Sequence, residues 1–218
     1  ADALMEKRAK TSKRGPRAGP MGSLGLAEGA HNRVKGQIRT IKSVLEEKMP
    51  GVKWFPGARL NFAENLLRFR DDHPAIVFQG EGQARRTLSY RELYDQVSRL
   101  AKAMRAHGIK VGDRVAGFVP NMPEAIVAML AATSVGAIWS SCSPDFGIKG
   151  VLDRFGQIAP RILFTADGYF YNGKTFDSLE RISGILKELP SVEKVVVIPY
   201  ASSEPDTSAV ANAVLFEE

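Results

Sequence analysis

The sequence predicts an α/β protein with a mostly parallel sheet and helices on both faces of that sheet. Short apolar runs alternate with longer segments whose apolar residues recur every three or four positions, which is typical of strands joined by helical crossovers. The run Val195-Val196-Val197-Ile198 is apolar on both faces, as the buried strands of parallel sheets are. A chain of 218 residues is long enough for one large domain, or for a smaller one with appendages.

The beginning of the chain differs from the rest in composition. Residues 1–30 are rich in Gly, Lys and Arg and show no hydrophobic period, so we expect a disordered basic leader. Residues 31–48 carry an apolar stripe at helical spacing and predict an N-terminal helix, which opens a helical and connecting region over residues 31–70. The stripe consists of Val34, Ile38, Ile41 and Leu45. Residues 71–218 are expected to form the α/β domain.

Strands and helices are then predicted in regular alternation. Asn61 is placed to cap a short helix that reaches Phe69. Ser89 and Glu92 form a capping box that opens a long helix, and Gly108 ends that helix. Strands are expected at residues 75–79, 86–88, 115–119, 138–141, 162–165 and 195–198, the first two as a hairpin. Further helices are expected at residues 122–136, 148–158 and 176–189, and an exposed loop after residue 200.

The basic character of the chain lies in its first part. Through Lys48 there are eleven Lys and Arg against five Asp and Glu, a surplus of six that equals the net charge of +6. The remainder is therefore neutral. A basic leader attracts nucleic acid or anionic lipid, but here Gly and Pro interrupt the charges and no aromatic residue accompanies them. This pattern favours a solvated tail over a nucleic-acid partner.

The single cysteine, Cys142, cannot form an internal disulfide, which is typical of a reducing cytosol and predicts a cytoplasmic location. It lies among apolar and small residues with no histidine nearby, so we expect a packed thiol rather than a nucleophile. No apolar run approaches the length of a membrane-spanning helix, and the leader lacks the apolar centre of a secretory signal. A membrane is therefore not expected as a partner.

Two common motifs of α/β enzymes are absent from the sequence. It contains no Gly-x-Gly-x-x-Gly and no Gly-x-Ser-x-Gly, and its three histidines are scattered, so no metal site is predicted. The most informative segment is Ser143-Pro144-Asp145-Phe146-Gly147, a loop between a predicted strand and a predicted helix. Such junctions are where α/β proteins place their ligands.

Several separate segments resemble the acetoacetyl-CoA synthetases, a branch of the adenylate-forming acyl-CoA synthetase superfamily. Residues 54–65 follow the pattern W-F-x-G-x-x-L-N-[YF]-A-E-N that joins the N-terminal helical region of these enzymes to their core. The similarity covers about residues 49–200, and the acetoacetyl branch is favoured by residues 143–147, 151–155 and 171–174. The other segments that follow in the order of the family are residues 88–93, 112–115, 120–121, 128–131 and 136–141.

The resemblance implies a reaction in two halves. The carboxylate of acetoacetate attacks ATP, with magnesium, to give an acyl-adenylate and pyrophosphate, and the thiol of coenzyme A then displaces AMP. It also implies that coenzyme A approaches Ser143, Pro144, Asp145, Phe146 and Gly147, with Tyr171 and Lys174 toward its 3′-phosphoadenosine end. Because the Asp145 carboxylate repels phosphate, we expect contacts through backbone amides, hydroxyls or the Phe146 ring.

The resemblance places the catalytic groups outside this sequence. The phosphate loop ending in lysine, the adenine-binding segment and the lysine of the mobile C-terminal domain do not lie within residues 1–218. We therefore expect no catalytic residue in this chain, no activity of the chain alone, and no tight binding of ATP, coenzyme A or Mg. We also expect apolar surface exposed along residues 122–136 and 195–198, with self-association as the result.

Two other interpretations stay open at this stage. The chain could be part of an acetyl- or propionyl-CoA synthetase, against which Trp139 and the loop at residues 143–147 argue. It could instead be a non-catalytic module whose basic tail binds nucleic acid.

Overall fold

The computed structural model describes residues 59–217. The described residues all belong to one compact unit, Arg59–Glu218. The predicted leader, the predicted helix over residues 31–48 and the first part of the entry segment lie outside the described residues.

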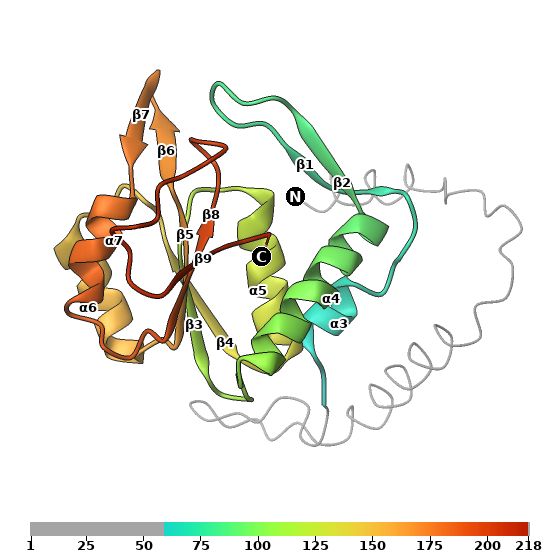
Figure 1. Cartoon of the computed structure of the whole chain (residues 1–218). Coiled ribbons are helices and arrows are strands. Elements are labelled where there is room, and N and C mark those ends of the chain that lie inside the picture. The colour runs from blue at the N-terminus through green and yellow to red at the C-terminus, as the bar shows by residue number, and fades with distance from the viewer. Residues whose placement is uncertain (1–58, 218) are drawn as a thin grey trace, which may run out of the picture. The chain divides into compact units, whose positions relative to one another are not determined.

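The described unit is built on a five-stranded sheet in which every pair of neighbouring strands is parallel (Figure 1). Its strand order is β4-β3-β5-β8-β9. The strands are β3 (Arg114–Phe118), β4 (Ile138–Cys142), β5 (Ile162–Ala166), β8 (Lys194–Ile198) and β9 (Ala213–Leu215). The predicted fold class is confirmed.

Helices cover both faces of this sheet (Figure 1). One face carries α3 (Phe62–Leu66), α4 (Tyr90–Ala106) and α5 (Pro123–Ser134), and the other carries α6 (Ile148–Ile158) and α7 (Leu179–Leu186). Because neighbouring side chains of a strand point to opposite faces, Phe164 packs in the cluster beneath α4 and α5, and Leu163 in the cluster beneath α6 and α7. The sheet thus separates two hydrophobic cores.

The caps that the sequence predicts for the first two described helices are present. The Ser89 hydroxyl accepts from the Glu92 N–H at 3.2 Å, while the Glu92 carboxylate accepts from the Ser89 N–H at 2.8 Å. That backbone hydrogen bond is the main reason why the pKa of Glu92 is lowered. Gly108 follows the end of α4 with a φ of 80°, and the Asn61 side chain accepts from the Glu64 N–H at 3.1 Å.

Two antiparallel hairpins accompany the main sheet. The predicted one pairs β1 (Pro74–Phe78) with β2 (Arg86–Ser89). The second pairs β6 (Gly168–Tyr171) with β7 (Lys174–Asp177), and the sequence analysis missed it. Its two turn residues, Asn172 and Gly173, have φ of 51° and 72°. Two central residues with positive φ characterise the type I′ turn that matches the twist of a hairpin.

The helix predicted over residues 176–189 was wrong at both ends. Phe176 lies in β7, where its ring stacks on Tyr169 of the opposite strand with centroids 5.1 Å apart. The Asp177 carboxylate accepts from the N–H groups of Leu179 and Glu180 at 2.7 and 3.2 Å, and this starts α7 after the hairpin.

The predicted exposure of apolar surface was wrong for residues 195–198, whereas along residues 122–136 one large apolar side chain, Ile126, is exposed, at 39%. Residues after Tyr200 do not only form a loop, because Val210 is buried and β9 pairs with β8. Strand β8 therefore has a partner on each side, and Val195 and Val197 are fully buried. Helix α5 is packed between α3, α4 and the sheet, so its face around Val127 is covered as well.

Within residues 59–217, no helix is both long enough and apolar enough to cross a membrane.

Candidate functional site at the carboxyl edge of the sheet

The predicted site residues follow the carboxyl ends of two strands of the parallel sheet. Strand β4 runs into the loop at Ser143–Gly147, and β5 runs through Asp167 into the hairpin that carries Tyr171 and Lys174. Since all strands of the sheet are parallel, both segments leave from the same edge. This is the edge at which open α/β sheets bind ligands.

The loop between β4 and α6 is a compact turn with an exposed rim. The Phe146 N–H donates to the Ser143 carbonyl oxygen at 3.2 Å, and Pro144 is buried beneath it. Ser143, Asp145 and Gly147 are exposed, as is the Phe146 ring at 37%. Gly147 is the N-cap of α6 and supplies no side-chain hydrogen bond to the first turn. The loop therefore exposes a hydroxyl-bearing residue, Ser143, an aromatic ring, Phe146, and a glycine, Gly147.

The Phe146 ring lies against α6. The Arg154 guanidinium stands 4.3 Å from the ring centroid and donates to the Gly150 carbonyl at 2.7 Å. A Cβ atom at Gly150 would lie 3.2 Å from the ring, so the glycine leaves the space that the ring uses. Arg154 therefore packs its guanidinium group against the Phe146 ring while it is held by the Gly150 carbonyl.

Tyr171 and Lys174 face each other across the second hairpin, which extends away from the sheet (Figure 1). Directly opposed residues of an antiparallel pair share one face, so the phenol and the ammonium group point to the same side. Both side chains are exposed, Tyr171 at 68%. An exposed phenol beside an exposed ammonium group is able to meet a negatively charged ligand.

The tip of this hairpin is held by a carboxylate from the other hairpin. Glu81, in the turn between β1 and β2, accepts from the Asn172 N–H at 3.1 Å and from the Gly173 N–H. These two amides lie between Tyr171 and Lys174 in the chain. No local pattern in the sequence indicates this contact, because its partners are more than ninety residues apart.

The base of the hairpin is fixed by a buried carboxylate and a glycine. Asp167 is 6% exposed and accepts from three successive N–H groups of the loop after β8. The donors are Tyr200, Ala201 and Ser202, at 2.7, 2.9 and 2.7 Å. A Cβ atom at Gly168 would lie 2.6 Å from a carbonyl oxygen of the opposite strand, so the hairpin base has room only for glycine.

One side chain connects the loop with the hairpin. The Arg181 guanidinium, from α7, donates to the Pro144 carbonyl at 2.9 Å and lies 5.9 Å from the centre of the Tyr169 ring. The loop and the hairpin, which both carry predicted site residues, are thereby joined through a half-buried arginine. The sequence analysis did not single out Arg181.

Cys142 is buried, and desolvation raises the pKa of its thiol. A raised thiol pKa means less thiolate, which is the nucleophilic form. Cys142 therefore packs beneath the loop, as the sequence predicts, and offers no nucleophile.

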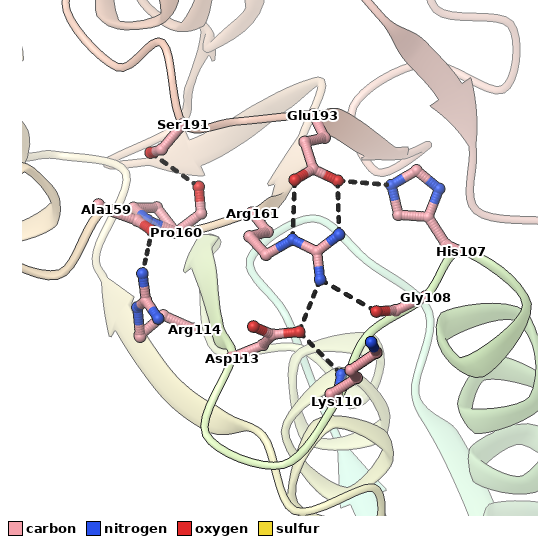
Figure 2. Close-up of polar contacts among 10 residues, drawn as sticks. All are labelled: His107, Gly108, Lys110, Asp113, Arg114, Ala159, Pro160, Arg161, Ser191 and Glu193. Carbon is pink, nitrogen blue, oxygen red and sulfur yellow. Dashed lines mark hydrogen bonds and ion pairs between the residues drawn. The ribbon is translucent and has the colours of Figure 1, made fainter.

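A second polar cluster lies at the opposite, amino-terminal edge of the sheet (Figure 2). The Arg161 guanidinium donates to both Glu193 oxygens at 2.7 and 2.8 Å, to Asp113 at 2.6 Å and to the Gly108 carbonyl at 3.0 Å. His107 adds an Nε2 atom 3.6 Å from the Glu193 carboxylate, a distance for an ion pair rather than a hydrogen bond.

This amino-terminal cluster has a structural role. The Asp113 carboxylate accepts from the Lys110 N–H at 2.8 Å and shapes the turn before β3, as the sequence predicts. That hydrogen bond, followed by the one from Arg161, lowers the pKa of Asp113. The pKa of Glu193 is lowered mainly by its hydrogen bonds from Arg161. The cluster joins the starts of β3, β5 and β8, at the edge away from the candidate site.

Among the described residues, no group of three or more His, Cys, Asp and Glu side chains is placed to hold a metal ion.

Comparison with known proteins identifies the class. Residues 62–216 match the model of the AMP-binding enzyme family, and the chain belongs to this family. It is 48% identical over 193 residues to the acetoacetyl-coenzyme A synthetase of Rhizobium meliloti, a match covering 88% of this chain and 29% of that protein. It is 49% identical over 170 residues to the acetoacetyl-CoA synthetase of Gallus gallus, covering 76% of this chain and 26% of that protein.

The fold has the same relatives. The solved structure of the acetoacetyl-CoA synthetase from Streptomyces lividans matches 98% of this chain and 35% of its own, with a TM-score of 0.73 and 36% sequence identity. The chain thus spans about a quarter to a third of the length of the proteins it matches. The match over 193 residues is also longer than the region, residues 49–200, in which the sequence analysis found the resemblance.

Proposed function

We propose that this chain is part of an ATP-dependent acetoacetate–CoA ligase, which forms an acyl-adenylate and then a thioester. The observation that carries the proposal is the 48% identity to an acetoacetyl-CoA synthetase over 88% of the chain. An acetoacetyl-CoA synthetase is also the structural match that covers 98% of it. A cytoplasmic location is part of the proposal, since the only cysteine is a free thiol.

Within that enzyme, we assign to this segment the approach of coenzyme A. The assignment concerns Ser143, Pro144, Asp145, Phe146 and Gly147 in the loop, and Tyr171 and Lys174 in the hairpin. It is supported by the common edge from which both segments leave, and by the exposed ring, phenol and ammonium group on them. The exposed Asp145 carboxylate argues that the loop contacts the pantetheine or adenine part of the ligand rather than its phosphates.

The chain supplies positions for a ligand rather than the groups that carry out the first half-reaction. Phosphoryl transfer depends on donors and metal ions aimed at the charge that develops on the phosphates. Among residues 59–217, no group of three His, Cys, Asp and Glu side chains is placed to hold Mg. The sequence Gly-x-x-x-x-Gly-Lys-Thr at residues 168–175 forms the antiparallel β6–β7 hairpin rather than a loop between a strand and a helix. We therefore expect the chain alone to release no AMP and to bind neither ATP nor coenzyme A tightly.

A chimaeric enzyme tests the proposal. Residues 59–217 would replace the matching segment of the Streptomyces lividans enzyme, and AMP release would be measured with ATP, coenzyme A and acetoacetate, acetate or propionate. We expect acetoacetate to be the preferred acid. A folded chimaera that prefers acetate or propionate would support the alternative of an acetyl- or propionyl-CoA synthetase, and a folded but inactive one would contradict the proposal.

The alternative from another class is a non-catalytic module with a nucleic-acid-binding tail. The surplus of six positive charges in the first 48 residues is the observation that favours it. Titration of labelled single- and double-stranded nucleic acid with the 218-residue chain distinguishes the two. We expect no saturable binding near physiological salt, and salt-sensitive saturable binding would favour the module.

A further inference from the structure

Arg181 occupies a position that the assignment of the coenzyme A approach does not explain. It lies in the first turn of α7, directly after the hairpin, and its side chain reaches back over the hairpin base to the loop that follows β4. The Nη1 atom of Arg181 donates to the Pro144 carbonyl oxygen, and the guanidinium carbon Cζ lies 5.9 Å from the centre of the Tyr169 ring. Both contacts are to segments assigned to the same ligand.

Arg181 differs from the arginines that pair with carboxylates. Among residues 59–217, those are Arg86, Arg91 and Arg161. Within residues 59–217, no carboxylate lies within ion-pair distance of Arg181, although the side chain is half buried. The guanidinium group of Arg181 instead contacts the Pro144 carbonyl oxygen and the Tyr169 ring, which belong to the loop and to the hairpin that form the candidate site.

The segments that Arg181 joins are otherwise held separately. The loop is closed by its own turn and by Arg154 on α6, while the hairpin is held by Asp167 at its base and by Glu81 at its tip. The Tyr169 ring that Arg181 faces is itself locked by stacking on Phe176. The Arg181 hydrogen bond to Pro144 thus links the loop to a side chain that lies against the hairpin base.

We propose that Arg181 is a positioning residue that fixes the distance between the Ser143–Gly147 loop and the β6–β7 hairpin. The inference rests on the proposed function, because the two segments need a fixed spacing only if they receive one ligand. It assigns to Arg181 no contact with the reacting atoms. Lysine at this position keeps the charge and one donor, and methionine keeps the length without either.

Amide hydrogen exchange in the 218-residue chain tests the positioning itself. In Arg181→Met, we expect exchange of the Phe146 N–H, which donates to the Ser143 carbonyl, to accelerate about tenfold or more, as the loss of one hydrogen bond from a charged donor predicts. Arg181→Lys should recover most of the protection. The matched control is Arg114→Met, because Arg114 is also half buried and donates to two backbone carbonyls, but at the opposite edge. Unchanged exchange in the loop of Arg181→Met would overturn the inference.

A ligand titration tests whether the spacing matters for binding. Coenzyme A at millimolar concentration is added to the isotopically labelled chain, and amide shifts are followed in the loop and in the hairpin. We expect both segments to shift together in the parent chain and in Arg181→Lys, and only the hairpin to shift in Arg181→Met. Equal shifts of both segments in Arg181→Met would contradict a role in positioning. If coenzyme A shifts neither segment in the parent chain, the assignment of its approach fails, while hydrogen exchange still decides the role of Arg181.

Discussion

Arg161 shows how a single side chain can hold the amino-terminal edge of the sheet. Its guanidinium contacts Gly108 and Asp113 before β3 and Glu193 before β8, while Arg161 itself precedes β5 (Figure 2). Hydrogen bonds to both carboxylates raise its own pKa, so it stays charged throughout the range in which proteins fold. The sequence could predict the turn at Asp113, but not a cluster whose members are separated by some thirty to fifty residues.

This cluster predicts a specific dependence of stability on pH. The folded-state pKa values of Asp113 and Glu193 are lowered, so their contribution to stability is full above the unfolded-state values, near 4, and is lost as the pH falls through the folded-state values. Arg161→Met should therefore lower the free energy of unfolding at pH 7 more than at pH 3. Urea unfolding of both proteins at the two pH values measures this, and an equal loss at both would refute it.

Substitution of Gly168 tests how closely the two strands approach each other at the base of the second hairpin. An added Cβ atom would meet a backbone carbonyl at 2.6 Å and the Ala201 Cβ at 2.9 Å, so Gly168→Ala should reduce the free energy of unfolding by about 1–3 kcal/mol. Gly156→Ala is the control, because Gly156 is exposed within α6 with no atom within 4 Å of the new Cβ, and alanine there should stabilise by about 0.5–1 kcal/mol. Chemical denaturation measures the free energy of unfolding of both variants. Equal changes in Gly168→Ala and Gly156→Ala would show that the hairpin base can relax around the added Cβ atom.

At the scale of elements, the sequence predicts most where a local signal marks both ends. The apolar stripe of α6 gives its bounds, residues 148–158, without error, and the capping box places the start of α4. The second hairpin was missed although Asn172-Gly173 is a strong hairpin signal between aromatic residues. Its strands are only four residues long each, and Phe176, which lies in β7, was assigned to the next helix.

The hairpin tip gives a prediction at this scale. Glu81→Ala removes the acceptor of the Asn172 and Gly173 N–H groups, so we expect faster amide exchange at these two positions while the base near Tyr169 stays protected. Glu81→Gln keeps one oxygen acceptor and should show a smaller change. Glu188→Gln, at the exposed end of α7, controls for the loss of a negative charge. Protection that persists in Glu81→Ala would mean that the type I′ turn holds itself.

At the scale of the whole molecule, alternation of strands and helices predicts a parallel sheet but not its strand order. Strand β9 was missed because it is three residues long and follows a polar stretch, and only its pairing with β8 makes it a strand. Its presence covers the edge that was expected to cause self-association. Self-association stays a prediction, now without β8 as its basis, and the exposed side chain of Ile138 on the edge strand β4 is a better candidate.

The candidate site could be predicted only in part for a related reason. The loop at residues 143–147 is recognisable because strand, loop and helix follow one another in the chain. Arg181 and Glu81 act across the fold, so their roles exist only once β4, β5 and the two hairpins are in place. Residues that bind a ligand can resemble a known family, whereas residues that position them need the structure.

We propose that coenzyme A binds at the carboxyl edge of this sheet in an acetoacetate–CoA ligase. The measurement that tests it most directly is the KM for coenzyme A in the chimaera described above, with Lys174 intact and with Lys174→Ala. In Lys174→Ala, we expect the KM for coenzyme A to be several-fold higher, with the KM for ATP unchanged and little change in kcat. The reason is that the exposed ammonium group of Lys174 no longer contacts a phosphate of coenzyme A. An unchanged KM for coenzyme A, or equal rises for coenzyme A and ATP, would contradict it.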